Sequence, residues 1–251
     1  MSDLVIAQIT DTHIGPSDIP YRGIKVRQKF LNVLQVLANK KLDLLVLTGD
    51  LSAFEGEPEA YAWISQVLAE FPYPYIVMPG NHDHVIRMSR AFTLPNSEIS
   101  QGMLYFNRTI SGKRLLFLDS SPSYIAKPQL EWLSAQLADY KKPVLLFIHH
   151  PPLLCDCQFM DAHHSLRNIE EVWQVLKRLP QIKHIFCGHY HTGKTVIKNN
   201  KNIHLTPSTI FQIDTKTPHF AIEHMTPGWR IIKWGESIQT YIEYYKDSEK
   251  S

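Results

Sequence analysis

Cysteine is scarce in this chain, and long apolar runs are absent from it. Three cysteines occur among 251 residues, and the pair Cys155 and Cys157 lacks the two-residue gap of a thiol redox or zinc site. An odd and sparse set argues against a disulfide framework and fits a reducing compartment. No stretch of about 18 apolar residues suggests a membrane span, and residues 1–6 lack the basic and apolar regions of a signal peptide. These absences predict a cytoplasmic protein with no membrane partner.

The chain also lacks an excess of charge of either sign. It has 26 lysines and arginines against 24 aspartates and glutamates, a formal net charge of +2 at pH 7 with neutral histidine. Binding to nucleic acid or to an anionic membrane usually requires a strong positive field, so we expect neither as a partner. With 44% hydrophobic and 20% charged residues, the composition excludes a disordered chain or a coiled coil. Histidine is plentiful, with 13 residues, and we expect neutral imidazole to serve a specific purpose.

Apolar runs of strand length alternate with helical patterns, which is typical of an α/β protein. We predict strands at 4–9, 44–47, 75–78, 144–148 and 182–187, and a hairpin formed by 103–109 and 114–118. Helices are predicted from 24 to 37, from Pro58 to 71, through 130–140 and, capped by Ser165, through 166–176. After Thr192 only short strands and turns are expected. We expect one domain over residues 1–245 and a polar tail at 246–251.

Polar residues follow five of these strands at the point where each strand ends. They are Asp11-Thr12-His13, Gly49-Asp50, Gly80-Asn81-His82-Asp83, His149-His150 and Gly188-His189-Tyr190-His191. The carboxyl ends of parallel strands meet at one edge of a sheet, so a single site is predicted. Asp11 and His13 are two apart, and in an extended segment their side chains would leave on the same face. His189 and His191 repeat this spacing, and the preceding glycines permit close backbone approach.

The donors in these segments predict a metal centre. They offer carboxylate, imidazole and amide groups without thiolate, a mixture that suits Mn, Fe or Zn better than Mg or Ca. The candidate ligands are Asp11, His13, Asp50, Asn81, His149, His189 and His191. Seven are too many for one ion with an open position but suit two ions that share a hydroxide and clamp a phosphoryl group. His82, beside a ligand, could give a proton to the departing oxygen.

A plainer interpretation treats the same residues as turn and capping residues, because Asp, Asn and Gly are favoured after strands in any case. That interpretation explains one or two strand ends but not five in order. The five blocks resemble the signature of the calcineurin-like metallophosphoesterase superfamily. The resemblance implies a four-layer α/β/β/α sandwich with its metal site at the carboxyl ends of the strands. It also implies two ions per chain, Fe or Mn by preference and Zn as an option, with Asp50 as the bridging ligand.

The resemblance divides the candidate ligands between the two ions. One ion would be held by Asp11, His13, Asp50 and His191, and the other by Asp50, Asn81, His149 and His189. His150 would lie behind the ligands. The remaining histidines near the motifs, His84, His163 and His164, have no assigned role, and His184, His204, His219 and His224 are expected to be structural or exposed.

Several further segments resemble the bacterial class III cyclic-nucleotide phosphodiesterases of the cyclic AMP type. These segments are Cys155, Met160-Asp161, 164–168, 206–209 and 227–230. The resemblance implies hydrolysis of 3′,5′-cyclic AMP to 5′-AMP by a metal-bridging hydroxide, with His82 as general acid and Asn81 stabilising charge at phosphorus. Asn81, His82 and His191 would contact this small-molecule substrate.

Two alternatives remain open at this stage. The first is the same dinuclear chemistry on a glycerophosphodiester, a phosphomonoester or a nucleic-acid end, the last being disfavoured by the small net charge. The second is a non-catalytic scaffold of the same fold, which the complete set of ligands disfavours because a degenerate site seldom keeps all its buried polar groups. The oligomeric state is not predicted.

Overall fold

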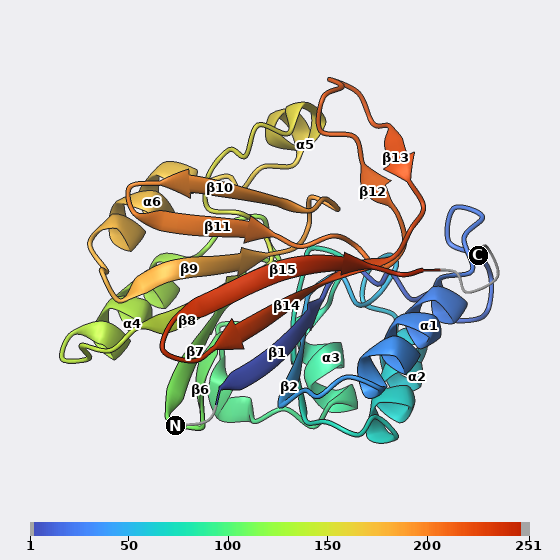
Figure 1. Cartoon of the computed structure of the whole chain (residues 1–251), viewed down its shortest axis with the longest axis horizontal. Coiled ribbons are helices and arrows are strands. Elements are labelled where there is room, and N and C mark those ends of the chain that lie inside the picture. The colour runs from blue at the N-terminus through green and yellow to red at the C-terminus, as the bar shows by residue number, and fades with distance from the viewer. Residues whose placement is uncertain (1–2, 247–251) are drawn as a thin grey trace.

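The computed structural model describes residues 3–246 and contains two sheets that face each other (Figure 1). The first sheet has the order β15 (Ile238–Tyr244), β14 (Gly228–Trp234), β1 (Leu4–Ile9), β2 (Leu44–Thr48) and β3 (Tyr75–Met78). The second has the order β10 (Lys194–Lys198), β11 (Lys201–Leu205), β9 (Ile182–Cys187), β8 (Val144–Ile148), β7 (Lys113–Leu118) and β6 (Phe106–Ile110). Strands β1, β2 and β3 are parallel, as are β7, β8, β9 and β11, so within each sheet the predicted loops lie at one edge.

Helices cover the outer faces of the two sheets (Figure 1). On the first sheet lie α1 (Val26–Ala38), α2 (Pro58–Ala69) and α3 (Val85–Ala91), and on the second α4 (Lys127–Leu137) and α6 (Ile169–Lys177). Each helix buries an apolar stripe; in α1 the stripe includes Phe30, Val33 and Leu37, at the spacing of a helix face. The arrangement is the expected four-layer α/β/β/α sandwich. Among residues 3–246, no helix has the length and apolar character needed to cross a bilayer.

Smaller elements join the layers. A short helix, α5 (Gln158–His163), and the two-stranded ribbon β12 (Gln212–Ile213) and β13 (Ile222–His224) lie together beyond the end of the second sheet (Figure 1). The 3₁₀ turn Asn96–Glu98 precedes the ribbon β4 (Ile99–Ser100) and β5 (Met103–Leu104). The predicted hairpin arm 103–109 is therefore divided between β5 and β6.

The predicted cap of α6 was wrong. The helix begins at Ile169 with Asn168 at its N-cap, three residues after Ser165. Leu166 is buried ahead of the helix, which explains why its spacing resembled a helical position. The Asn168 side chain holds the loop, because its Oδ1 accepts from the Ile125 N–H at 3.1 Å and its Nδ2 donates to the Ile125 carbonyl at 2.9 Å.

The region after Thr192 also differs from the prediction, because β14 and β15 are seven-residue strands of the first sheet. Strand β14 pairs antiparallel with β1, next to the centre of that sheet. Its apolar pattern is interrupted by Arg230, which is buried and donates to the Leu205 carbonyl at 2.8 Å and to the Thr240 hydroxyl at 3.1 Å. Because this charged residue interrupts the apolar pattern, the strand was not predicted from the sequence. Most of the predicted polar tail, residues 247–251, lies outside the described residues.

His204, in the core of the second sheet, makes the stability of the folded chain depend on pH. It is buried in β11, stacked on Phe186 at 4.8 Å, and its ring nitrogens pair with the Thr195 hydroxyl and with His184, each at 3.0 Å. Burial, with smaller effects of Arg230 and His184, lowers the pKa of His204 to about 3. In the unfolded chain a histidine binds a proton near pH 6.5, so the folded form loses stability as the pH falls below that value.

We expect His204→Phe to reduce this acid sensitivity. The free energy of unfolding of the wild type should fall between about pH 7 and about pH 5 by up to about 2 kcal/mol more than that of the variant, because phenylalanine has no proton to exclude. Urea titrations of both proteins at the two pH values measure the difference. An equal pH effect in the two proteins would show that His204 is not a source of it.

Candidate metal centre

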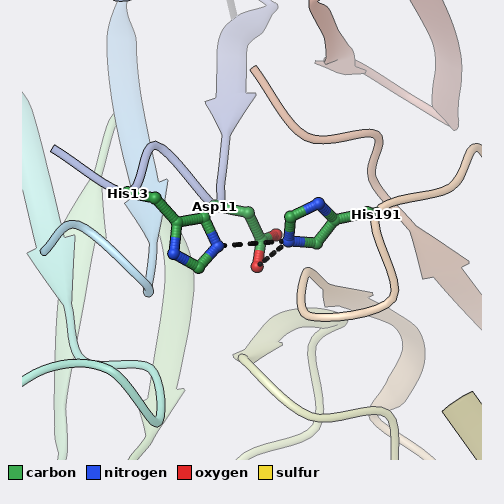
Figure 2. Close-up of side chains that lie close together, drawn as sticks. All are labelled: Asp11, His13 and His191. Atoms are coloured by element: carbon green, nitrogen blue, oxygen red, sulfur yellow. Dashed lines mark hydrogen bonds and ion pairs between the residues drawn. The ribbon is translucent and has the colours of Figure 1, made fainter. Parts of the chain in front are cut away.

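Asp11, His13 and His191 converge from loops that follow strands of two different sheets (Figure 2). Asp11 and His13 follow β1, and His191 follows β9. The Nε2 atoms of His13 and His191 are 3.2 Å apart, and Nε2 of His191 is 3.3 Å from Oδ1 of Asp11. All three side chains are buried. One candidate ligand atom from each lies within 4.8 Å of the others, close enough for the three to share one cation.

A second group of the same kind consists of Asp50, His149 and His189. Nε2 of His149 is 3.4 Å from Oδ1 of Asp50. The other carboxylate oxygen of Asp50, Oδ2, is 3.8 Å from Nε2 of His13. Asp50 therefore directs one oxygen toward each group, which is the position that a bridging carboxylate requires.

The backbone at these residues is left-handed. Asp11, His13, Asp50, His189 and His191 all have φ between 44° and 66°, a region that residues with a Cβ seldom adopt. The expectation that Asp11 and His13 share a face because their segment is extended was wrong. The segment leaves the strand and turns sharply at each of these residues, and it is this turning that brings both side chains to the site. The same correction applies to His189 and His191.

Glycines allow the loops to approach one another, as expected from the sequence. A Cβ on Gly49 would lie 2.5 Å from Nδ1 of His149, and one on Gly80 would collide with the Asp50 carboxylate. A Cβ on Gly188 would collide with the side chain of Thr10 and come within 2.9 Å of Oδ2 of Asp11. Real Cβ atoms do not make such contacts, so the convergence of the ligands requires glycine at these three positions.

Backbone carbonyls orient three of the imidazoles. Nδ1–H of His149 donates to the Thr48 carbonyl at 2.7 Å, and Nδ1–H of His191 donates to the Phe211 carbonyl at 3.2 Å. Nε2–H of His189 donates to the carbonyl of His164 at 2.9 Å. Each bond fixes the orientation of the ring and leaves the other ring nitrogen available to a cation, as in the outer shell of metal sites. No sequence signal marks these acceptors, because every residue has a carbonyl.

The donor set fits cations. Nε2 of His149, which faces Asp50, is buried without a hydrogen-bond partner among the described residues, which is costly for a polar atom unless a ligand satisfies it. Burial opposes ionisation of Asp11, but His191 and His149 outweigh it and hold its pKa at about 2. Burial likewise disfavours charge on His149, yet Asp50 and Asp11 raise its pKa to about 9. The site therefore attracts positive charge at the position of His149.

Two other imidazoles, those of His13 and His189, are held neutral. Burial, partly offset by Asp50, lowers the pKa of His13 to about 3. Burial and the proximity of His149 lower the pKa of His189 to about 3. A neutral imidazole is the form of histidine that ligates metals.

His82 and Asn81 lie at the opening of the site. They line a cavity of about 350 Å³ together with the candidate ligands His13, Asp50, His189 and His191. The backbone N–H of His82 donates to Oδ1 of Asp50 at 2.9 Å, and its ring Nδ1–H donates to the Phe54 carbonyl at 3.1 Å. Its ring is edge-on to His13 at 4.9 Å, and it forms a third group with His13 and Asp50 whose candidate ligand atoms lie within 4.8 Å.

Asp83 is a residue whose contribution the sequence did not reveal. Its carboxylate accepts the backbone N–H groups of Leu51, Ser52 and Gly80 at 3.1, 3.1 and 2.8 Å, and the Tyr61 hydroxyl at 2.9 Å. It therefore ties the loop that carries Asp50 to the loop that carries Asn81. Burial, followed by the negative charge of Asp50, raises the pKa of Asp83 to about 6.

We expect Asp83→Asn to weaken metal binding by roughly 10- to 100-fold, because the amide loses one acceptor and turns an N–H toward the backbone donors. Competition with a chelator of known affinity measures the change. Tyr61→Phe is the matched control: it removes the hydroxyl that donates to Asp83 and accepts the His84 N–H, but it keeps all three backbone bonds of Asp83, and its affinity should stay close to that of the wild type. Equal affinity in Asp83→Asn and the wild type would contradict the positioning role.

The neighbouring histidines have different surroundings. His150 is buried, pairs through Nδ1 with the Ser120 hydroxyl at 2.9 Å and lies 4.0 Å from the ring of His189. It therefore packs behind a candidate ligand, as expected. His84 is exposed at the start of α3, while His163 and His164 line a second cavity beside Asn81, and His164 also lines the first.

Comparisons with known proteins place this arrangement in a family. Residues 4–193 match the model of the calcineurin-like phosphoesterase family. A protein of Fibrobacter succinogenes named "Probable cyclic nucleotide phosphodiesterase" is 39% identical over 245 residues, covering 98% of this chain and 95% of the relative. A protein of Escherichia coli strain K12 named "3′,5′-cyclic adenosine monophosphate phosphodiesterase CpdA" is 34% identical over 239 residues, covering 91% and 84%.

Solved structures agree on the fold. A dimetal phosphatase from Danio rerio superposes with a TM-score of 0.67 at 14% sequence identity, covering 97% of this chain and 99% of that one. Identity this low concerns the fold alone. Because the family match spans well over half of the chain and the relatives extend over nearly all of it, this protein belongs to the calcineurin-like phosphoesterase family and is a phosphoric diester hydrolase.

Proposed function

We propose that this enzyme hydrolyses 3′,5′-cyclic AMP to 5′-AMP with the aid of two metal ions. The observation that carries the proposal is the pair of Asp and His groups that meet at Asp50 beneath an open cavity lined by His82. The names of the Fibrobacter and Escherichia relatives, which specify cyclic nucleotides and cyclic AMP, support the choice of substrate. The buried free thiols of Cys155, Cys157 and Cys187 support a cytoplasmic location.

The ligands divide into two sets that share Asp50. Asp11, His13 and His191 would hold one ion with it, and Asn81, His149 and His189 the other. Nitrogen and oxygen donors without thiolate favour Fe or Mn and accommodate Zn. Ions bound in such a pair supply Lewis acidity, which makes water nucleophilic near neutral pH and neutralises charge on the phosphoryl oxygens.

The chain's own groups would complete the reaction. Water adds its oxygen to phosphorus and gives up a proton to solvent, the bond from phosphorus to the 3′-oxygen breaks, and that oxygen needs a proton. His82 can supply it, because the Phe54 carbonyl holds Nδ1–H and leaves Nε2–H of the imidazolium for the cavity. The Asn81 amide would donate to a phosphoryl oxygen, where negative charge grows in the transition state. His191 would complete the substrate contacts.

Steady-state kinetics of metal-reconstituted protein test the proposal. Cyclic AMP, cyclic GMP, a glycerophosphodiester and a phosphomonoester are compared under identical conditions with Mn, Fe and Zn. We expect the highest kcat/KM for cyclic AMP. A higher value for the glycerophosphodiester or the phosphomonoester would replace the proposed substrate with that ester, and no hydrolysis of any ester would favour the scaffold.

A further inference from the structure

The cavity above the candidate ligands is polar on one side and aromatic on the other. Its aromatic side consists of Tyr21, Phe159, Phe211 and Phe220, which we call the aromatic wall. The four residues come from the loop after β1, from α5 and from the ribbon β12–β13 with its connecting loop. These segments are far apart in the sequence, and α5 and the ribbon lie side by side beyond the second sheet (Figure 1).

The aromatic wall begins beside the candidate ligands and extends outward. The ring of Phe211 is 4.8 Å from His191, and the ring of Tyr21 is stacked parallel on His13 at 5.2 Å. Phe220 follows, edge-on to Phe211 at 6.0 Å and to Phe159 at 5.8 Å. An aromatic surface made of rings at different inclinations is thus continuous with the place where the phosphate would lie.

Phe220 and Arg22 form the outer part of this surface. The guanidinium carbon of Arg22 is 5.2 Å from the centre of the Phe220 ring and 5.8 Å from that of Tyr21, so the arginine bridges the two loops. Packing accounts for the buried Phe211, but it does not account for Phe220, whose side chain leaves 37% of its surface in solvent at the mouth of the cavity. An exposed aromatic residue beside a polar site is available to a ligand with a flat apolar part.

We propose that the aromatic wall, with Phe220 and Arg22 at its outer edge, is the subsite that binds the purine base of the cyclic nucleotide. The inference rests on the proposed function, because the phosphate must occupy the polar side for the base to reach the wall. Bases stack on aromatic side chains and on guanidinium groups, and stacking contacts the face of the base. The cavity of about 350 Å³ lies in the size range of small-molecule sites.

Phe220→Ala distinguishes the contribution of the base to catalysis from that of the phosphate. The substrates are cyclic AMP and ribose 3′,5′-cyclic phosphate, which has the same phosphodiester ring and no base. For the variant we expect kcat/KM with cyclic AMP to fall by about 5- to 150-fold, the range typical of one lost stacking contact. With the base-free substrate we expect no change. Phe220→Tyr should restore the cyclic AMP value.

Ile222→Ala is the matched control. This residue belongs to the same ribbon, is exposed and apolar, and lies outside the cavity. Its kcat/KM should equal that of the wild type with both substrates. An equal loss with both substrates in Phe220→Ala, or no loss with cyclic AMP, would overturn the base subsite.

A measurement of equilibrium binding tests the base subsite independently of the proposed function. Wild-type holoenzyme should bind 5′-AMP more tightly than ribose 5-phosphate, and Phe220→Ala should lose that difference. Failure of the proposed function would instead be seen as a wild-type enzyme that does not hydrolyse cyclic AMP. If the wild type bound both ligands equally, the base subsite would be wrong whatever ester the enzyme cleaves.

Discussion

Asp50→Ala is expected to abolish hydrolysis and to lower the metal content from about two ions per chain. The reason is the position of the carboxylate, with Oδ1 3.4 Å from His149 and Oδ2 3.8 Å from His13. Asp50 reaches toward both Asp and His groups with a different oxygen for each, so its removal affects both ions. Its Oδ1 also accepts the backbone N–H of His82, so the loop with the candidate acid loses an anchor.

Elemental analysis after reconstitution and gel filtration measures this effect, with circular dichroism to confirm that the variant is folded. Asp156→Ala is the matched control, because that aspartate side chain is 97% exposed and pairs only with Lys194 among the described residues. It should retain the metal content and the activity of the wild type. If Asp50→Ala kept both ions, Asp50 would not be the bridge.

His82→Ala is expected to lower kcat for cyclic AMP by roughly 10²- to 10⁴-fold, the usual contribution of a positioned general acid. Metal content should be unchanged. A phosphodiester with a nitrophenolate leaving group needs little protonation, so the variant should hydrolyse it nearly as well as the wild type. This difference between substrates is what identifies a proton donor, because loss of a substrate contact would affect both esters.

His84→Ala serves as the control for His82, since it is a histidine two residues away that is exposed at the start of α3. It should behave as the wild type with both esters. The structure also allows a competing role for His82, that of a metal ligand. Because His82 also lies with His13 and Asp50, a loss of metal in His82→Ala would make it a ligand and would remove the general-acid role.

The sequence predicted the strands and the site for a physical reason. Strand β8 is a fully buried, uninterrupted apolar run, and β1, β3, β8 and β9, which are rich in apolar residues, occupy the predicted ranges. Polar residues at the ends of such strands are conspicuous against that background. Asp11 and Asp50 follow neighbouring parallel strands of one sheet, so their approach could be predicted without the details of the loops. His191 follows a strand of the other sheet, so its convergence with them depends on how the two sheets pack.

Other features depend on contacts between distant segments and leave little trace in the sequence. Strand β14 contains Arg230, and only the acceptors supplied by Leu205 and Thr240 make that residue compatible with burial. Asp83 adjoins a motif, but its role comes from backbone donors that every residue possesses. Neither Phe159 nor Phe220 belongs to a recognisable sequence motif, and the two form one surface only after folding.

The left-handed backbone at the candidate ligands determines the order in which the enzyme matures. Each such residue with a Cβ costs about 1 to 2 kcal/mol relative to ordinary backbone, so an isolated loop containing Asp11 and His13 would not adopt this shape. The two sheets must assemble first and hold the loops together. We therefore expect metal uptake to follow folding, and chelation followed by reloading to proceed without refolding of the polypeptide.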